Sequence, residues 1–216
     1  NGGESVYDAI SLQLEKRYAD TWSARVSYSL SYSRGTATSQ NARNTDQFLT
    51  DLRLDKLWGP TAVDRRHILS ISARTEIPKT GGATLATVVR YMTGAPFTLF
   101  DSGIDADQNG ELDDPLPPGT YSGTGPNAMS DVTDKGGRNG AYGPDYLQVD
   151  VRAGWRRRVA KNTLELFVDV YNITNRTNFE NPGADRRLTA TFLVPTLLRG
   201  GSGFPRQAQL GVRYSF

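Results

Sequence analysis

The chain has 216 residues, with 25 lysines and arginines against 23 aspartates and glutamates, and no cysteine. The net charge of +2 gives no global field that favours nucleic acid or an acidic substrate, and the lack of cysteine excludes a disulfide framework and a thiolate metal site. No run of about 18 apolar residues occurs, which excludes membrane-spanning helices. A mean hydropathy of −0.50 does not exclude a membrane barrel, because its spanning strands are only half apolar.

The first two predicted strands have the clearest pattern. Residues 5–17 alternate with a period of two, and residues 22–33 do so again after a short polar turn at 18–21. One face of the second strand holds five serines and Arg25, whereas the other carries aromatic residues at its ends and aliphatic residues between them. Five serines and an arginine cannot form a packed core, but they suit the wet interior of a membrane barrel whose outer face meets lipid.

The next two predicted strands follow a long polar connection over residues 34–64. Alternation resumes in residues 66–76 and in residues 83–93. Proline and glycines in the turn at 78–82 account for the reversal between them. These two segments therefore predict a β-hairpin.

The last three predicted strands come after residues 94–145, which lack a sustained period. Residues 146–155 and 163–171 alternate, and we expect a basic turn at 156–161 between them. A third long polar connection leads to residues 207–216, which alternate without a fault and end on an aromatic side chain.

Short and long connections alternate strictly along the chain, as they do in barrels with short periplasmic turns and long extracellular loops. The pattern predicts an all-β fold of about seven antiparallel transmembrane strands, with the C-terminus in the periplasm. Seven is odd, whereas bacterial single-chain barrels normally have an even number of strands. We therefore expect residues 1–216 to be one C-terminal portion of a larger barrel, with the plug domain and N-terminal strands absent from this sequence.

Several stretches resemble the C-terminal barrel region of TonB-dependent outer-membrane receptors, in particular the Oar-like subgroup with an N-terminal carboxypeptidase-regulatory-like domain. The stretches are residues 64–70, 93–98, 137–139, 143–152, 170–182 and 214–216. The resemblance covers almost the whole chain. It implies a plugged barrel in the bacterial outer membrane, surrounded by lipid, that takes up an unknown extracellular ligand.

The same resemblance implies two protein partners. One is a TonB-type energy-coupling protein, which would be reached through an N-terminal region that this sequence lacks. The other is the barrel-assembly machinery, which reads an aromatic-ended terminal strand. The residues expected to carry that assembly signal are Leu210, Val212, Tyr214 and Phe216.

One stretch suggests calcium. Oxygen-bearing side chains recur at relative positions 1, 3, 5 and 9 of an acidic segment, and Gly110 stands at position 6, where a calcium loop bends sharply. The candidate ligands are Asp105, Asp107, Asn109, Glu111 and Asp113, with Glu111 contributing its backbone carbonyl. Position 12 is Leu116 instead of the usual bidentate glutamate, and Asp114 could replace it. The alternative is a solvated acidic turn in an outer loop.

No catalytic motif is present, and we expect no enzyme. His67 is the single histidine and is expected to be a polar residue where a strand enters the membrane. Glu165 and Asp169 share a strand face, but lumen-facing groups bonded to Arg152 or to a plug explain them better than an acid/base pair. The function expected is ligand uptake. The alternative is an outer-membrane binding or adhesion module, a self-contained barrel with a calcium-ordered loop at 94–145.

Overall fold

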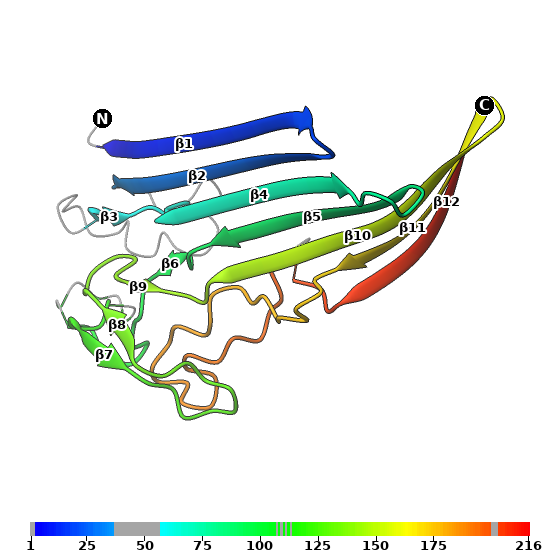
Figure 1. The fold of residues 1–216 in the computed structure, drawn as a ribbon. Helices are drawn as coiled ribbons and strands as arrows, with labels where there is room; N and C mark the ends of the chain where they lie inside the picture. Colours follow the sequence, from blue (N-terminus) through cyan, green and yellow to red (C-terminus); the bar gives the residue numbers. More distant parts are fainter. Residues whose placement is uncertain are drawn as a thin grey trace.

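The computed structural model describes residues 3–36, 57–106, 108, 110, 112, 114–199 and 203–216. Seven long strands lie side by side in chain order, each antiparallel to its neighbours (Figure 1). They are β1 (Ser5–Ala19), β2 (Trp22–Gly35), β4 (His67–Glu76), β5 (Ala83–Met92), β10 (Tyr146–Val159), β11 (Asn162–Tyr171) and β12 (Gln207–Ser215). The short strand β3 (Gly59–Pro60) pairs with the end of β2. The predicted all-β antiparallel fold is confirmed.

Two of the predicted turns are shorter than expected. The basic turn at 156–161 is wrong, because Arg156 to Val159 continue β10 and pair with β11 as far as Asn162. The charged side chains fit the strand because they alternate faces, with Arg156 opposite Glu165. The turn at 18–21 is likewise reduced, since β1 runs to Ala19.

The two tight turns contain residues with positive φ. Asp20 and Thr21 have φ of 51° and 76°, and Ala160 has φ of 56°. Two-residue hairpin turns need such backbone angles to match the twist of the flanking strands.

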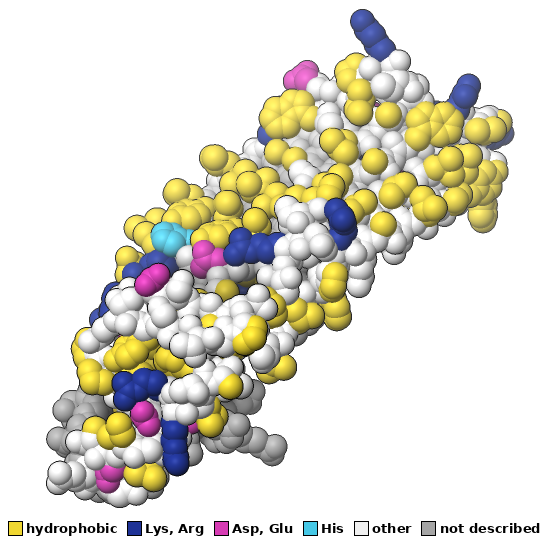
Figure 2. Space-filling view, turned by 90° about the horizontal axis from the view of Figure 1, so that it is seen from below, with side chains coloured by type: hydrophobic (Ala, Val, Ile, Leu, Met, Phe, Trp, Pro, Cys, Tyr) yellow, Lys and Arg dark blue, Asp and Glu magenta, His cyan; other side chains and the backbone are white. Residues whose placement is uncertain are grey.

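The sheet carries its apolar side chains on one face across all seven strands. The pairing register places Tyr28, Leu69, Tyr91 and Leu147 in one row across β2, β4, β5 and β10. None of these four side chains is fully buried, and on the outermost strands the same face is largely exposed, with Leu14 73% and Leu210 84% exposed. Figure 2 shows hydrophobic side chains spread over the sheet. An apolar face of this extent has to be covered by lipid or by another protein surface.

Aromatic side chains border this apolar face at both ends of the strands. On β2, Tyr32 and Trp22 stand ten residues apart, about 34 Å along a strand and about 26 Å across a membrane at a tilt of roughly 40°. That height is close to the apolar band of about 25 Å in outer-membrane barrels. Near the turn end, Lys16 Nζ lies 4.1 Å from the centroid of the Trp22 ring. Such aromatic belts with snorkelling cations mark the two membrane–water boundaries.

The buried hydrophobic core lies within the long connections, and not between two packed β-sheets as in a soluble β-sandwich. Residues 93–145 and 172–206, as far as the structure describes them, fold together into what we call the loop cap. Four short strands lie in the cap: β6 (Pro96–Phe97), β7 (Gly119–Tyr121), β8 (Val132–Asp134) and β9 (Ala141–Tyr142). Its buried cluster consists of Phe97, Leu99, Leu116, Val132, Ala141, Phe192 and Leu193.

The two connections of the cap are also joined through their backbones. The Met129 N–H donates to the Leu193 carbonyl at 2.8 Å, and the Phe100 N–H donates to the Ala184 carbonyl at 3.1 Å. The third connection is therefore not simply polar, as the sequence suggested, since it supplies Phe192 and Leu193 to a core.

The two outermost strands each have one partner in the described part of the chain. β1 pairs with β2, and β12 pairs with β11. Six antiparallel steps separate them, so β1 and β12 run in the same direction, from the loop end to the turn end of the sheet.

A charge on the apolar face should destabilise the protein in a depth-dependent way. Val151 stands four residues from both Leu147, in the row of Tyr91, and Trp155 on β10. We expect Val151→Arg to lower the free energy of unfolding in lipid vesicles by about 2–4 kcal/mol, and Leu166→Arg, beside Trp155 at the boundary, by about 0–1 kcal/mol.

Ser27→Arg serves as the control, because Ser27 lies on the polar face between Gln13 and Ser70. Urea or guanidinium unfolding from the same vesicles measures all three variants. Equal tolerance of arginine at Val151 and at Ser27 would contradict a lipid-facing apolar surface.

Candidate functional site

The polar face of the sheet, which we call the polar wall, has two chemically different halves. On β1, β2 and β4 it consists largely of hydroxyl groups. Its serines are Ser11, Ser23, Ser27, Ser29, Ser70 and Ser72. Ser11 and Ser29 stand opposite each other with their hydroxyl oxygens 3.1 Å apart. This half, the hydroxyl half, offers uncharged donors and acceptors along the middle of the strands, and its fixed charges lie near the turn end, where Arg25 pairs with Glu15 and Arg74 with Glu76.

The other half, on β5, β10, β11 and β12, is built from ion pairs. Arg152 Nε and Nη2 donate to the two carboxylate oxygens of Asp169 at 2.5 and 2.7 Å. Gln209 Nε2 adds a third hydrogen bond to Asp169 at 2.9 Å. The expected bond between Asp169 and Arg152 is present. Its bidentate geometry is the strong form of an arginine–carboxylate pair.

The remaining acidic side chains of this half also have arginine partners. Asp150 lies 3.6 Å from Arg90 Nη2 and accepts the backbone N–H of Asn172 at 2.9 Å. Glu165 lies 3.4 Å from Arg156 and 3.8 Å from Arg213. This half of the polar wall therefore carries many charges, and each of these carboxylates has an arginine within 4 Å.

Two shallow hollows lie along the polar wall. One, of about 490 Å³, is lined near the turn end by Arg17, Arg25, Ser72 and Arg74 among others. The second, of about 340 Å³, is lined by charged and aromatic side chains of the ionic half. Its polar lining residues are Arg90, Asp150, Arg152, Asp169 and Tyr171.

On the strands with ion pairs, which we call the ionic half, the ring of Phe167 occupies the space left by the missing side chain of Gly211. Phe167 lies opposite Gly211, and a Cβ at Gly211 would lie 2.1 Å from Phe167 Cζ. The Arg152 guanidinium lies 4.3 Å from the centroid of the Phe167 ring. Gly211 is thus required by close packing, and the ring covers the bare backbone of the edge strand.

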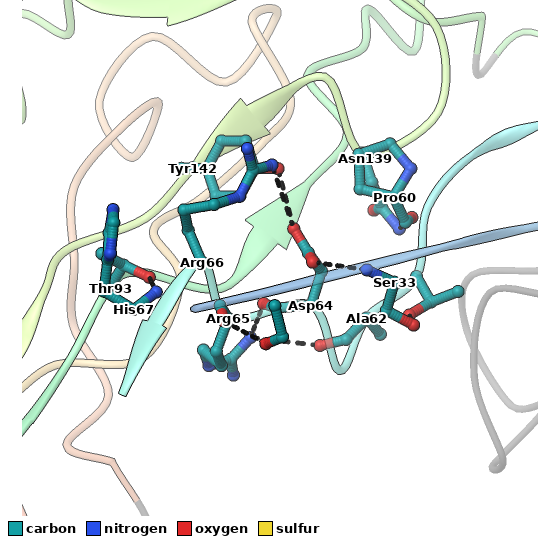
Figure 3. A network of polar contacts seen from close by, with 12 residues as sticks. Ser33, Pro60, Ala62, Asp64, Arg65, Arg66, His67, Thr93, Asn139 and Tyr142 are labelled. Atoms are coloured by element: carbon teal, nitrogen blue, oxygen red, sulfur yellow. Dashed lines mark hydrogen bonds and ion pairs between the residues drawn. The ribbon is translucent and has the colours of Figure 1, made fainter. Parts of the chain in front are cut away.

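A buried carboxylate anchors the loops to the end of β2 (Figure 3). Asp64 is 2% exposed, and its Oδ1 accepts the backbone N–H of Ser33 at 2.8 Å. Its Oδ2 accepts the Tyr142 hydroxyl at 2.9 Å and lies 3.8 Å from Arg66 Nη2. Burial, and next the hydrogen bond to Asp64, raise the pKa of the Tyr142 phenol, which stays a donor.

Two neighbouring side chains extend this anchor into the loop cap. Asn139 Nδ2 donates to the Pro60 carbonyl at 2.7 Å, and the Asn139 N–H donates to Thr98 Oγ1 at 2.9 Å. The Arg138 guanidinium donates to the carbonyls of Gly35 and Gly59. Segments about 80 to 100 residues apart in sequence are thereby held together.

A second group of polar anchors ties the cap to β5 and β10. Asp145 accepts the Tyr91 hydroxyl and the Gly94 N–H, each at 2.9 Å. Asn178, 1% exposed, bonds both the N–H and the carbonyl of Leu147 at 3.0 Å. Asn178 therefore satisfies the backbone of β10 where no further strand pairs with it.

The chain matches the family described as outer membrane beta barrel domain over residues 1–209. It belongs to this outer membrane β-barrel family. No curated protein and no solved structure matches the chain, and no helix in the described part is long and apolar enough to cross a membrane.

Membership of the outer membrane β-barrel family places the protein in the bacterial outer membrane. The apolar face of the sheet then contacts lipid, and the polar wall faces the barrel interior. In these barrels the tight turns lie on the periplasmic side and the long loops on the extracellular side.

The calcium ligands expected from the sequence are only partly described. Asp105 Oδ2 accepts the Gly110 N–H at 2.9 Å, and Asp114 Oδ2 accepts the Ala106 N–H at 2.5 Å. The other four candidates lie outside the described residues; they are Asp107, Asn109, Glu111 and Asp113. Among the residues that the structure describes, no three His, Asp or Glu side chains form a metal-binding group. Calcium binding stays a prediction.

The expected assembly signal lies on the edge strand. Leu210, Val212 and Tyr214 share the apolar face of β12, and they are 84%, 70% and 55% exposed. Phe216 follows with its ring 6.3 Å from that of Tyr214. The structure shows these side chains accessible at the periplasmic end, and their recognition by assembly machinery stays a prediction.

The sequence did not predict the anchoring roles of Asp64, Asn139, Asp145 and Asn178. All four lie in stretches that carried the family resemblance, and this was the signal available. Their partners are 31 to 79 residues away in sequence, so spacing alone could not show that they hold the loops.

Replacing Gly211 with alanine tests the packing of the barrel interior. Because its Cβ would overlap Phe167, we expect Gly211→Ala to cost about 1–3 kcal/mol of stability, as overpacking usually does. In a Phe167→Ala background the same change should cost much less, and a double-mutant cycle in vesicles measures the coupling. Equal costs in both backgrounds would contradict the contact.

Asp134 should make the loop cap less stable as the pH rises. Its side chain is 3% exposed, Oδ2 has no hydrogen-bond partner, and burial raises its pKa above the ordinary 3.8 although the Gly136 N–H opposes the shift. A raised folded pKa means that the contribution to stability is fully present below pH 3.8 and is lost as the pH rises through the folded value.

An asparagine at position 134 cannot ionise, so Asp134→Asn should not lose stability as the pH rises. The denaturation midpoint of the variant should therefore increase relative to that of the wild type from pH 4 to pH 7. Comparing the two proteins cancels the opposite effect of carboxylates with lowered pKa, such as Asp185. A difference that does not change with pH would refute the role given to Asp134.

Proposed function

We propose that this chain is the C-terminal wall of a TonB-dependent receptor that takes up a scarce extracellular ligand, such as a siderophore, glycan or peptide. The observation that carries the proposal is a polar wall that runs the length of the strands and ends at a folded extracellular cap. Hydroxyl groups and locally paired charges suit a wet interior that binds a plug or a polar ligand. The resemblance in residues 64–70 and 170–182 supports the same assignment.

The direction of the edge strands supports a larger barrel. Within the bilayer each backbone N–H and C=O needs a partner, so β1 and β12 cannot stay unpaired on their outer sides. Both strands run toward the turn end, so joining them to each other would create a parallel pair. Pairing β12 of one molecule with β1 of a second molecule inserted in the same orientation would also be parallel. Antiparallel closure requires an odd number of further strands, which we assign to an N-terminal part of the same protein.

The alternative is a self-contained barrel that serves in binding or adhesion. Because the chain has no cysteine, two introduced cysteines test this directly in the intact protein in outer membranes. Ser11→Cys with Gln209→Cys places one thiol on each edge strand. The larger barrel predicts no cross-link between them, whereas a barrel closed by these seven strands predicts one.

The matched control is Ser11→Cys with Ser29→Cys. These two residues face each other across β1 and β2, so this pair should cross-link in either architecture. Failure of the control would show that the conditions do not report neighbouring strands. A cross-link between β1 and β12 would refute the larger barrel.

Uptake itself is tested with the intact gene product in cells. Depletion of small molecules from the medium should depend on the gene and on the TonB-type coupling protein. Depletion or cell adhesion that depends on the gene alone would favour the binding module. Calcium at Asp105 is a separate proposal, and calorimetric titration with calcium chloride should show binding that Asp105→Asn weakens.

A further inference from the structure

The two hollows of the polar wall meet on β5 and form one groove. Ala86 and Val88 line both the hollow of about 490 Å³ and the hollow of about 340 Å³. The lining residues come from six neighbouring strands, from Arg17 on β1 to Tyr171 on β11. The steps between these strands, at about 4.8 Å each, give a length of about 24 Å across the sheet. We call this continuous depression the wall groove, and its length suits an elongated ligand.

The floor of the wall groove is apolar. Ala86 lies between Arg74 and Arg152 on the neighbouring strands, so a short side chain stands between two long ones. Val88 continues this floor along β5 toward the loop end. Tyr171 is 39% exposed and supplies an aromatic ring at one end of the groove. Ligand sites typically combine such apolar and aromatic surface with a few well-placed polar groups.

The charges along the wall groove are largely neutralised. Four of its arginines have a carboxylate within 4 Å, and the pairs are Arg25–Glu15, Arg74–Glu76, Arg90–Asp150 and Arg152–Asp169. Of the other two lining cations, Lys16 is turned to the Trp22 ring at the membrane boundary. Arg17, at the turn end, has no ion pair in the described part of the chain. The groove therefore has no excess of charge near Tyr171 that would select an anion or a cation.

One ion pair of the wall groove leaves room for a hydroxyl group. Arg90 Nη2 lies 3.6 Å from Asp150 Oδ2, which is too long for a direct hydrogen bond. The Arg90 side chain is 51% exposed, so its N–H groups can reach a ligand. A hydroxyl group can accept from Arg90 and donate to Asp150 at once, because it is both acceptor and donor. An ionic ligand would instead meet a like charge on one side of the pair.

The Tyr171 end of the wall groove lies toward the extracellular side. Arg90 directly precedes Tyr91, which belongs to the row of Tyr28 and Leu69 near the loop end of the sheet. Asp150 accepts the backbone N–H of Asn172, the first residue of the second connection of the loop cap. Since the long loops of these barrels are extracellular, a ligand that enters between the loops reaches this end first.

We propose that the wall groove binds an uncharged oligosaccharide. The apolar C–H faces of the sugar rings lie on Val88 and on the Tyr171 ring, and hydroxyl groups at the ring edges bond Arg90 and Asp150. Successive sugar units then follow the groove across β5 into the hydroxyl half. The inference rests on the proposed function, because it names the class of ligand that the barrel takes up.

The test is calorimetric titration of the intact gene product, purified in detergent, with four neutral hexasaccharides. They are maltohexaose, cellohexaose, xylohexaose and mannohexaose, and hexagalacturonate serves as the anionic probe. At least one neutral hexasaccharide should bind more tightly than hexagalacturonate. The disaccharide of the same series should bind more weakly than the hexasaccharide, because it cannot span the groove.

Variants of the groove locate the bound sugar. Tyr171→Ala should weaken binding roughly fivefold, whereas Tyr171→Phe keeps the ring and should retain most of the binding. Arg90→Ala should also weaken binding roughly fivefold, as the loss of a hydrogen bond does. Val88→Phe raises the floor and should abolish binding. The matched control is Ser29→Phe, which adds the same ring to the polar wall beside Ser11, outside both hollows, and should leave binding unchanged.

Three outcomes would overturn the proposal. They are binding of none of the four neutral hexasaccharides, tighter binding of hexagalacturonate, and equal binding by the wild type, Tyr171→Ala and Arg90→Ala. The last would be the result if another domain of the same protein filled the groove, and it does not depend on whether Val88→Phe folds. Coupling-dependent uptake without oligosaccharide binding would refute the sugar ligand and leave the proposed function intact. Oligosaccharide binding without coupling-dependent uptake would do the reverse.

Discussion

The lipid bilayer imposes the constraint on which the rest of this structure depends. Hydrocarbon offers no hydrogen bonds, so strands can cross it only when their backbone groups pair with each other and their outward side chains are apolar. The seven long strands meet the first demand through continuous antiparallel pairing and the second through strict alternation. Alternation leaves half of each strand polar, which explains how a chain with a mean hydropathy of −0.50 belongs in a membrane.

A sheet with lipid on one face and water on the other cannot supply a conventional hydrophobic core. In this protein the buried aliphatic and aromatic cluster lies in the loop cap, where Leu99 and Leu193 are fully buried. The cap is joined to the sheet by polar anchors, of which Asp64 and Asn178 are the most deeply buried. A buried carboxylate is costly unless it is fully bonded, so these anchors hold the loops in one arrangement and rule out many others.

The sequence was sufficient to find all seven strands, because alternation is a local property and the membrane requires it along the whole crossing. The sequence-based prediction was wrong at 156–161, where three consecutive arginines suggested a turn. The strand continues through these arginines with alternating faces. Arg156 pairs with Glu165 on the polar face, and Arg157 lies 5.8 Å from the centroid of the Trp155 ring on the apolar face. The core of the cap was missed because Phe97, Val132 and Phe192 follow no period. The anchors depend on contacts between distant segments, which no spacing in a single sequence displays.

The two halves of the polar wall suggest how the barrel interior handles polar molecules. In the ionic half, Arg152 is held by Asp169, and Arg156 and Arg213 share Glu165. Charges neutralised this closely produce a weak field a short distance into the interior. In the hydroxyl half, Ser27 and Ser70 face each other without a fixed charge between them. A ligand or a plug domain in contact with this wall would find many hydrogen-bonding groups but no strong electrostatic trap. Passage through such an interior would then depend on the exchange of hydrogen bonds more than on the sign of the ligand's charge.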